Sequence, residues 1–157
     1  MSVTGLDVFD TTVHRTNAWL KRLMELEGWP ERREAYRALR ATLHALRDRL
    51  TIEEAAQLSA QLPMLVRGIY FEGWDPTGKP VRDRHLEDFL GRMDRELEGD
   101  PPIDAEEAAV AVFQVLQERV TDGELEDVMA LMPRELVELW AGGPVAGEPY
   151  EGQRPFA

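Results

Sequence analysis

The side chains best suited to recognition gather in one turn-rich stretch of this chain. The stretch combines three aromatic with three charged residues, and the predicted binding residues are Tyr70, Phe71, Trp74, Asp75, Lys79 and Arg82. Aromatic groups beside mixed charges are typical of interface hot spots and of small-ligand clefts. The alternative is structural: the aromatic residues fold back over the core and Trp74 acts as a lid.

The same stretch contains a partial phosphate-binding motif. Gly73 to Lys79 fit the first seven positions of a P-loop, but Pro80 stands where a hydroxyl should hold Mg²⁺. Pro76 also lacks one of the backbone N–H groups that such a loop directs at phosphates. We therefore interpret the segment as a turn, and we predict no nucleotide or other cofactor.

Histidine spacing gives no metal-binding pair. The chain has three histidines, His14, His44 and His85, and no two of them have the spacing that places two imidazoles on one metal. His14 and His85 occupy near-equivalent positions of an internal repeat, one residue out of register. A site made from these two and a carboxylate therefore stays open as an alternative, although no metal ligand is predicted. His44 is expected on a helix surface or between helices.

Acidic residues cluster where helices are expected to begin. Glu53 and Glu54 follow Thr51, and Glu124 follows Thr121 at the same distance as Glu54 follows Thr51. Carboxylates at a helix N-terminus complement the helix dipole by ~0.3–1 kcal/mol each, and we interpret them in that way. General acid–base catalysis would need a cleft and shifted pKa values, so no catalytic residue is predicted.

These residues are carried by a chain that repeats itself at an offset of 70 residues. Matching pairs include Leu43 and Phe113, Leu46 and Leu116, Thr51 and Thr121, Pro63 and Pro133, and Tyr70 and Trp140. An internal repeat determines the architecture before any local pattern does. We predict an N-terminal extension over 1–8, helical repeat one over 9–78, helical repeat two over 79–140 and a disordered tail over 141–157.

Apolar residues recur with a period near 3.6, which predicts helices throughout both repeats. The expected helices span 10–27, 31–50, 52–62, 64–71, 83–97, 104–120, 122–132 and 134–140. Phe9 and Val13 fall on the apolar stripe of the first helix, and Leu46 and Leu116 fall on core positions. No segment alternates long enough to predict a strand. The fold class is therefore all-α, with two tandem helical repeats packed as one bundle-like domain.

Composition excludes several classes of function. With 30 acidic and 18 basic residues the net charge is -12, which repels phosphate backbones and anionic lipids. The chain has no cysteine, which removes disulfides and thiolate chemistry. No segment approaches about 18 apolar residues, and the first residues carry no signal-peptide pattern. We expect no nucleic-acid partner, no membrane partner and a cytoplasmic location.

Four motifs are shared with a known family. They are Asp10-Thr11-Thr12 with Asn17-Ala18-Trp19-Leu20, the segment Leu43 to Thr51, Ala60-Gln61-Leu62-Pro63, and Tyr70-Phe71-Glu72-Gly73-Trp74. Over roughly residues 7–140 the chain resembles an uncharacterised bacterial family, the domain of unknown function family 2267. The resemblance implies a helical two-repeat protein from bacteria. It implies no activity and no catalytic residue.

Together these patterns predict a non-catalytic helical interaction or regulatory module in the bacterial cytoplasm. Its partner would be another protein or a second copy of the chain. The alternative is a small-ligand-binding protein that uses a cleft near Tyr70 and Trp74. A metal-dependent enzyme built on His14 and His85 is the third possibility.

Overall fold

Helices are the only regular secondary structure in the part of the chain that the structure describes. The structure is a computed structural model, and it describes residues 2–141. Its helices are α1 (Asp7–Glu27), α2 (Arg32–Asp48), α3 (Ile52–Ser59), α4 (Met64–Phe71), α5 (Leu86–Leu97), α6 (Ala105–Arg119), α7 (Asp122–Ala130) and α8 (Arg134–Trp140).

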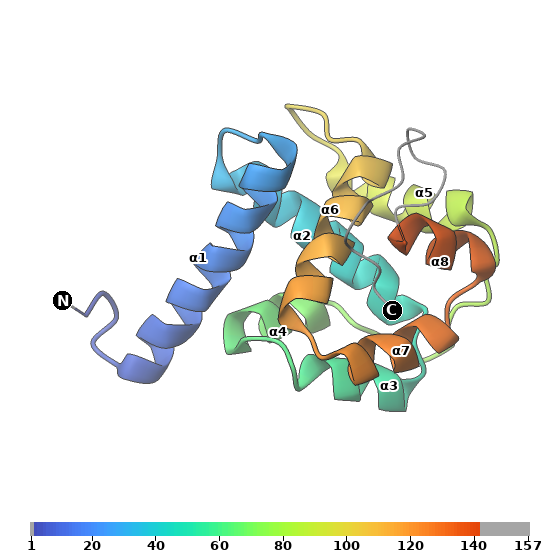
Figure 1. Ribbon diagram of the computed structural model, residues 1–157, viewed down its shortest axis with the longest axis horizontal. Helices are drawn as coiled ribbons and strands as arrows, with labels where there is room; N and C mark the ends of the chain where they lie inside the picture. The colour runs from blue at the N-terminus through green and yellow to red at the C-terminus, as the bar shows by residue number, and fades with distance from the viewer. Residues whose placement is uncertain (1, 142–157) are drawn as a thin grey trace.

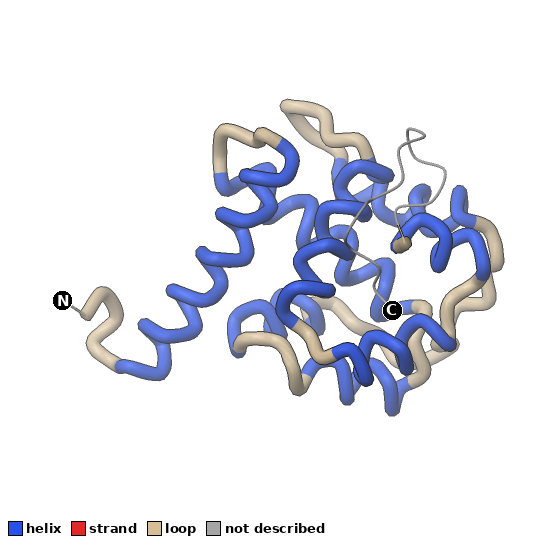
Figure 2. The backbone as a smooth tube through the Cα atoms, in the orientation of Figure 1, coloured by secondary structure: helices blue, strands red, loops and turns tan. Residues whose placement is uncertain are grey.

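The predicted all-α class is confirmed for the described residues, and loops alone connect the helices (Figure 1, Figure 2). The tail predicted over 141–157 lies outside the described residues, apart from Ala141. None of the described helices is long and apolar enough to cross a membrane.

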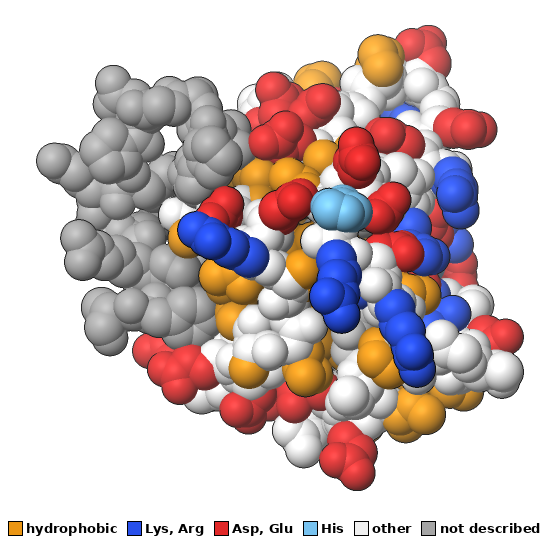
Figure 3. Space-filling view, turned by 90° about the vertical axis from the view of Figure 1, so that its right-hand side faces the viewer, with side chains coloured by type: hydrophobic (Ala, Val, Ile, Leu, Met, Phe, Trp, Pro, Cys, Tyr) orange, Lys and Arg blue, Asp and Glu red, His pale blue; other side chains and the backbone are white. Residues whose placement is uncertain are grey.

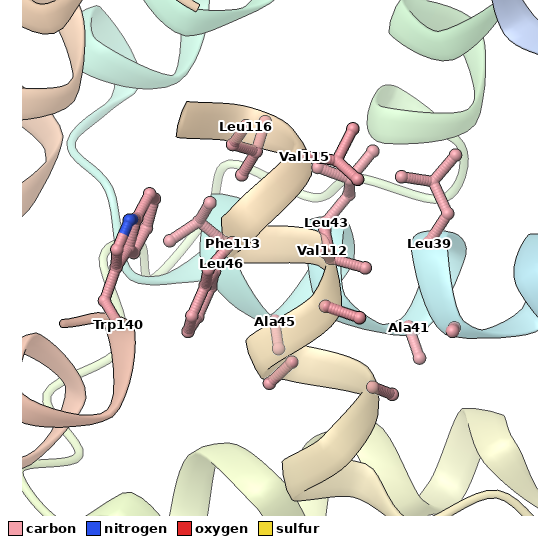
Figure 4. Close-up of a cluster of buried hydrophobic side chains, with 14 of the residues drawn as sticks. Leu39, Ala41, Leu43, Ala45, Leu46, Val112, Phe113, Val115, Leu116 and Trp140 are labelled. Atoms are coloured by element: carbon pink, nitrogen blue, oxygen red, sulfur yellow. The ribbon is translucent and has the colours of Figure 1, made fainter. Parts of the chain in front are cut away.

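Helix α2 lies at the centre and packs against α1, α4, α5 and α6. Its residues from Ala41 to Arg47 are all buried, because neighbouring helices cover it on several sides. Leu46 of α2 and Leu116 of α6 have no exposed surface, as their spacing predicts. Figure 4 shows both in the core between these helices, where Phe113 also stacks on Trp140 of α8 with ring centroids 4.2 Å apart. One core therefore joins the first and second halves of the chain.

Threonine side chains cap α3 and α7, two short helices that pack against each other. The Thr51 hydroxyl accepts a hydrogen bond from Glu54 N at 3.2 Å, and the Thr121 hydroxyl accepts one from Glu124 N at 3.4 Å. Such bonds satisfy backbone donors that have no partner inside the helix. The Thr-x-x-Glu spacing predicts a reciprocal capping box, and its hydroxyl half is confirmed for both helices. The carboxylate half is not formed at α7, where Thr121 N donates to the side chain of Gln61 instead of to Glu124.

The first helix starts earlier, and is less buried at that end, than the sequence predicts. It begins at Asp7 rather than at residue 10, and Figure 1 shows its first turns projecting from the body. Phe9 is 49% exposed and Val13 is half-buried, so the apolar stripe that the sequence places on this helix is not buried at its N-terminal end. The cause is tertiary, because the buried residues of α1 begin only at Thr16.

Helix α5 begins at Leu86 rather than at residue 83. The preceding chain is bound to the end of α2 instead. Val81 N donates to Asp48 O at 2.8 Å, and Arg49 Nη1 donates to Val81 O at 2.6 Å. Because these groups bond to α2, this segment does not add an N-terminal turn to α5.

Candidate functional site

The predicted aromatic residues lie together at the end of α4. The rings of Tyr70 and Phe71 meet edge to face with centroids 4.9 Å apart, and those of Phe71 and Trp74 lie 5.2 Å apart. Tyr70 is fully buried, and its hydroxyl donates to Ala55 O at 3.0 Å. Burial raises the pKa of Tyr70. Tyr70 therefore belongs to the core, while Phe71 and Trp74 pack half-buried against it.

The charged residues of the predicted site lie farther along the loop. Asp75 accepts a hydrogen bond from Thr77 N at 2.9 Å, which lowers the pKa of Asp75, and the charge of Lys79 lowers it further. Lys79 is half-buried and Arg82 is exposed. The structure thus brings the three aromatic rings together, and Asp75 with Lys79. A binding role for all six residues stays a prediction.

Changing Trp74 to alanine is expected to lower the free energy of unfolding by about 3 kcal/mol, because the half-buried ring covers the core. Trp74→Phe keeps most of the apolar contact and removes an indole N–H that is buried without an acceptor. That control variant should therefore unfold close to wild type. Urea melts measure both changes. Unchanged stability in Trp74→Ala would contradict a lid role and favour a contact role.

The histidines occupy three different environments. His14 is exposed on α1, and His85 is exposed just before α5. Among the described residues one group of acidic or histidine side chains is close enough to share a metal, and it includes neither histidine. His44 is buried, with its ring nitrogens 2.7 Å from Ile69 O and from a carboxylate oxygen of Glu96. His44 is therefore the interhelical histidine that the sequence allowed.

A buried arginine attaches the end of α4 to α2. Arg47 Nη1 donates to Tyr70 O at 2.8 Å and to Glu72 O at 2.9 Å. Both carbonyls lie at the C-terminal end of α4, where no backbone N–H of the helix is available to donate to them. Sequence patterns missed this role, because α2 carries five arginines and nothing in their spacing sets Arg47 apart as the buried one. Arg47 positions the aromatic residues and does not itself form a ligand site.

Two buried carboxylates face each other where α3 packs on α7. Glu54 is 8% exposed and Glu124 is 9% exposed. Their carboxylate oxygens, with one of Asp127, lie within 4.8 Å of one another. One oxygen of each glutamate is buried without a hydrogen-bond partner. Burial, a hydrogen bond to Glu54 and the nearby charges of Glu54 and Asp127 raise the pKa of Glu124 to about 8.

The interpretation of these two glutamates as helix-dipole residues is therefore incomplete. A carboxylate that only complements a helix dipole has a lower free energy when it stays hydrated. These two side chains are instead buried. The sequence held a signal, since Glu54 and Glu124 are the same position of two capped helices. The two side chains meet only because α3 packs on α7, and this packing cannot be read from the sequence.

A cleft lined by three arginines opens between α1, the start of α4 and the end of α6, and we call it the arginine cleft. It has a volume of about 400 Å³, and its lining includes Arg15, Arg67 and Arg119 with Trp19, Leu62 and Met64. No carboxylate of the described residues lies within 4.0 Å of these arginines. The cleft is thus cationic in a chain whose net charge is -12.

Exposed apolar side chains border the arginine cleft. A neighbouring hollow of about 220 Å³ lies between the projecting turns of α1 and the start of α4, and both Arg15 and Met64 line it as well. Thr12 holds its two walls together, because its hydroxyl accepts a hydrogen bond from Leu65 N at 2.8 Å. Val8 and Met64 line this hollow and are 47% and 49% exposed, and Leu65, next to Met64, is 43% exposed.

The helical fold and the motifs agree with one family. Residues 16–139 match the model of the family described as "Uncharacterized conserved protein (DUF2267)". The match covers most of the chain, so the protein belongs to this family, as its motifs predict. No curated protein matches the chain. The match begins at Thr16, the first buried residue of α1, so the projecting turns lie outside it.

Proposed function

We propose that this protein is a non-catalytic helical interaction module whose arginine cleft binds an acidic, partly apolar segment of a partner protein. The observation that carries the proposal is the convergence of Arg15, Arg67 and Arg119 on one cleft. The partner segment would supply carboxylates to Arg15 and Arg119. Arg67 would add its positive charge, because its Nε and Nη2 already donate to Ser59 O and Leu62 O. It would also supply apolar side chains to Met64 and its exposed neighbours.

Charge supports an anionic partner at this place. Several arginines outside the cleft lie against acidic residues, as Arg22 does with Glu118 at 2.9 Å and Arg40 does with Glu96 at 2.8 Å. Three arginines around one cleft repel one another, so their placement costs free energy that an anion offsets. A guanidinium group also binds a carboxylate through two parallel hydrogen bonds, which adds geometric specificity to the attraction.

The apolar border supports a peptide over a nucleic acid. Val8, Met64 and Leu65 offer surface to anchoring side chains, which carry much of the energy of interfaces. A nucleic acid brings a continuous line of phosphates that a net charge of -12 repels outside the cleft. On the face shown in Figure 3, basic side chains are interspersed with acidic and apolar ones.

We also infer that the scaffold consists of the two repeats that the sequence predicts. In support, α3 and α7 begin at residues 52 and 122, and α4 and α8 begin at residues 64 and 134, each pair 70 apart. The arginines of the cleft do not follow this repeat, because the residue 70 positions after Arg67 is Val137. The position of the second repeat that corresponds to Arg67 therefore lacks this cation, and we expect no equivalent cleft there.

Fluorescence anisotropy with a labelled peptide of alternating glutamate and leucine tests the proposed function. Arg15→Glu/Arg119→Glu reverses two exposed charges of the arginine cleft and is expected to weaken binding at least tenfold, about 1.4 kcal/mol. The control Arg32→Glu/Arg84→Glu makes the same change at exposed positions outside the cleft lining. It should bind like wild type at ~150 mM salt, which screens distant charges.

Three outcomes would count against this function. The first is an equal loss of affinity in both double variants, and the second is no saturable binding of the peptide to wild type. The third is equal binding of a peptide in which glutamine replaces glutamate. Displacement of the peptide by inorganic phosphate or citrate at comparable concentrations would favour the small-ligand alternative instead.

A further inference from the structure

The packing of α3 on α7 forms a second potential site, separate from the arginine cleft. Glu54 and Glu124 each come from the first turn of their helix. Asp127 lies one turn farther along α7 and is exposed, so it gives the group a side open to solvent. The three residues each offer an oxygen within 4.8 Å of the others.

The two glutamates are buried without a compensating cation from the described protein. Each keeps less than a tenth of its surface exposed, and each has a carboxylate oxygen that is buried with no hydrogen-bond partner. No described lysine, arginine or histidine forms an ion pair with Glu54, Glu124 or Asp127. Unpaired carboxylates in a poorly solvated site are costly, and neighbouring like charges increase the cost. The unpartnered oxygens thus favour a cationic ligand.

We propose that Glu54, Glu124 and Asp127 bind a divalent cation that prefers oxygen ligands, of the class of Ca²⁺, Mg²⁺ and Mn²⁺. Carboxylates are typical ligands of these hard cations, whereas zinc favours the nitrogen and sulfur ligands that the group lacks. Two oxygens on opposite sides of an ion at about 2.1–2.4 Å lie about 4.2–4.8 Å apart. Oxygens that all lie within 4.8 Å of one another are therefore close enough to share such an ion.

A bound cation would join the N-terminal turns of α3 and α7, which come from different halves of the chain. Because the three ligands meet only when these helices pack together, the ion binds the folded state and stabilises it. At a hundredfold excess over Kd, the melting temperature should rise by roughly 5–10 °C for a chain of this size.

The experiment uses the full chain after EDTA treatment and titrates it calorimetrically with CaCl₂, MgCl₂ and MnCl₂. One equivalent of at least one of these ions is expected to bind and to raise the melting temperature. Glu54→Gln and Glu124→Gln keep the side-chain shape and should weaken binding at least tenfold. Glu53→Gln and Glu126→Gln remove the same charge at exposed positions on the same helices, and they should bind like wild type.

Substituting a buried glutamate can alter folding, so the test also includes a variant at the exposed ligand. Asp127 is exposed, so Asp127→Asn should weaken ion binding while the metal-free protein melts like wild type. Equal affinities in the site and control variants would overturn the proposal, as would no binding of any of the three ions up to ~10 mM. Neither result bears on the arginine cleft, which uses different residues.

Discussion

Truncating Leu46 or Leu116 to alanine is expected to lower the free energy of unfolding by about 2–5 kcal/mol in each case. Both side chains are fully buried in the core of Figure 4, one on α2 and one on α6. The loss combines the transfer free energy of the removed methyl groups with the cavity that the neighbouring helices cannot fill. Urea melts of the two variants measure it, and similar environments should give similar losses.

Ile52→Ala is the matched control for these core variants. Ile52 is 52% exposed, so its truncation should change stability by no more than ~0.5 kcal/mol. If both core variants also stay within ~0.5 kcal/mol of wild type, the model of one core shared by α2 and α6 is wrong.

Glu124→Gln is expected to change how stability depends on pH. The pKa of Glu124 is raised in the folded protein above its ordinary value of 4.5, so the folded state keeps a proton that the unfolded state releases. The stability contributed by that proton is fully present below the unfolded pKa, and it is lost as pH rises through the folded pKa. Each pH unit inside this window should cost wild type about 1.4 kcal/mol relative to the neutral amide.

Urea melts in EDTA at a series of pH values measure this difference. Glu54 of α3 and Asp127 of α7 face Glu124, and Tyr70 also interacts with its charge, so all three remain unchanged in the comparison. Glu126→Gln removes an exposed carboxylate of α7 and should follow wild type. A stability difference between wild type and Glu124→Gln that is constant with pH would contradict the raised pKa.

The sequence predictions that hold rest on local signals. Pro63 and Pro133 cannot donate the i→i−4 bond of a helix interior, and α4 and α8 each begin at the next residue. The Thr51 and Thr121 caps need only a hydroxyl and a backbone N–H three residues away. Leu46 follows from apolar spacing along one helix. None of these predictions requires knowing which helices pack together.

The features that sequence patterns did not predict depend on helix packing. Phe9 has the spacing of a core residue, but α1 projects past the helices that would cover it. Glu54 meets Glu124 only because α3 packs on α7. The carbonyls that Arg47 binds lie 23 and 25 residues farther along the chain. The cations of the arginine cleft come from three different helices.

The projecting turns of α1 set a thermodynamic condition on any partner that contacts them. Helical order there rests on local propensity and on the Asp10 carboxylate, which accepts a hydrogen bond from Thr4 N at 2.9 Å. Helical turns with little tertiary support are marginal in water, so we expect this end of α1 to exchange between folded and frayed forms. Apparent affinity then scales with the folded fraction. We therefore expect substitutions that alter helix propensity in these turns to change the affinity for such a partner even where the altered residue does not contact it.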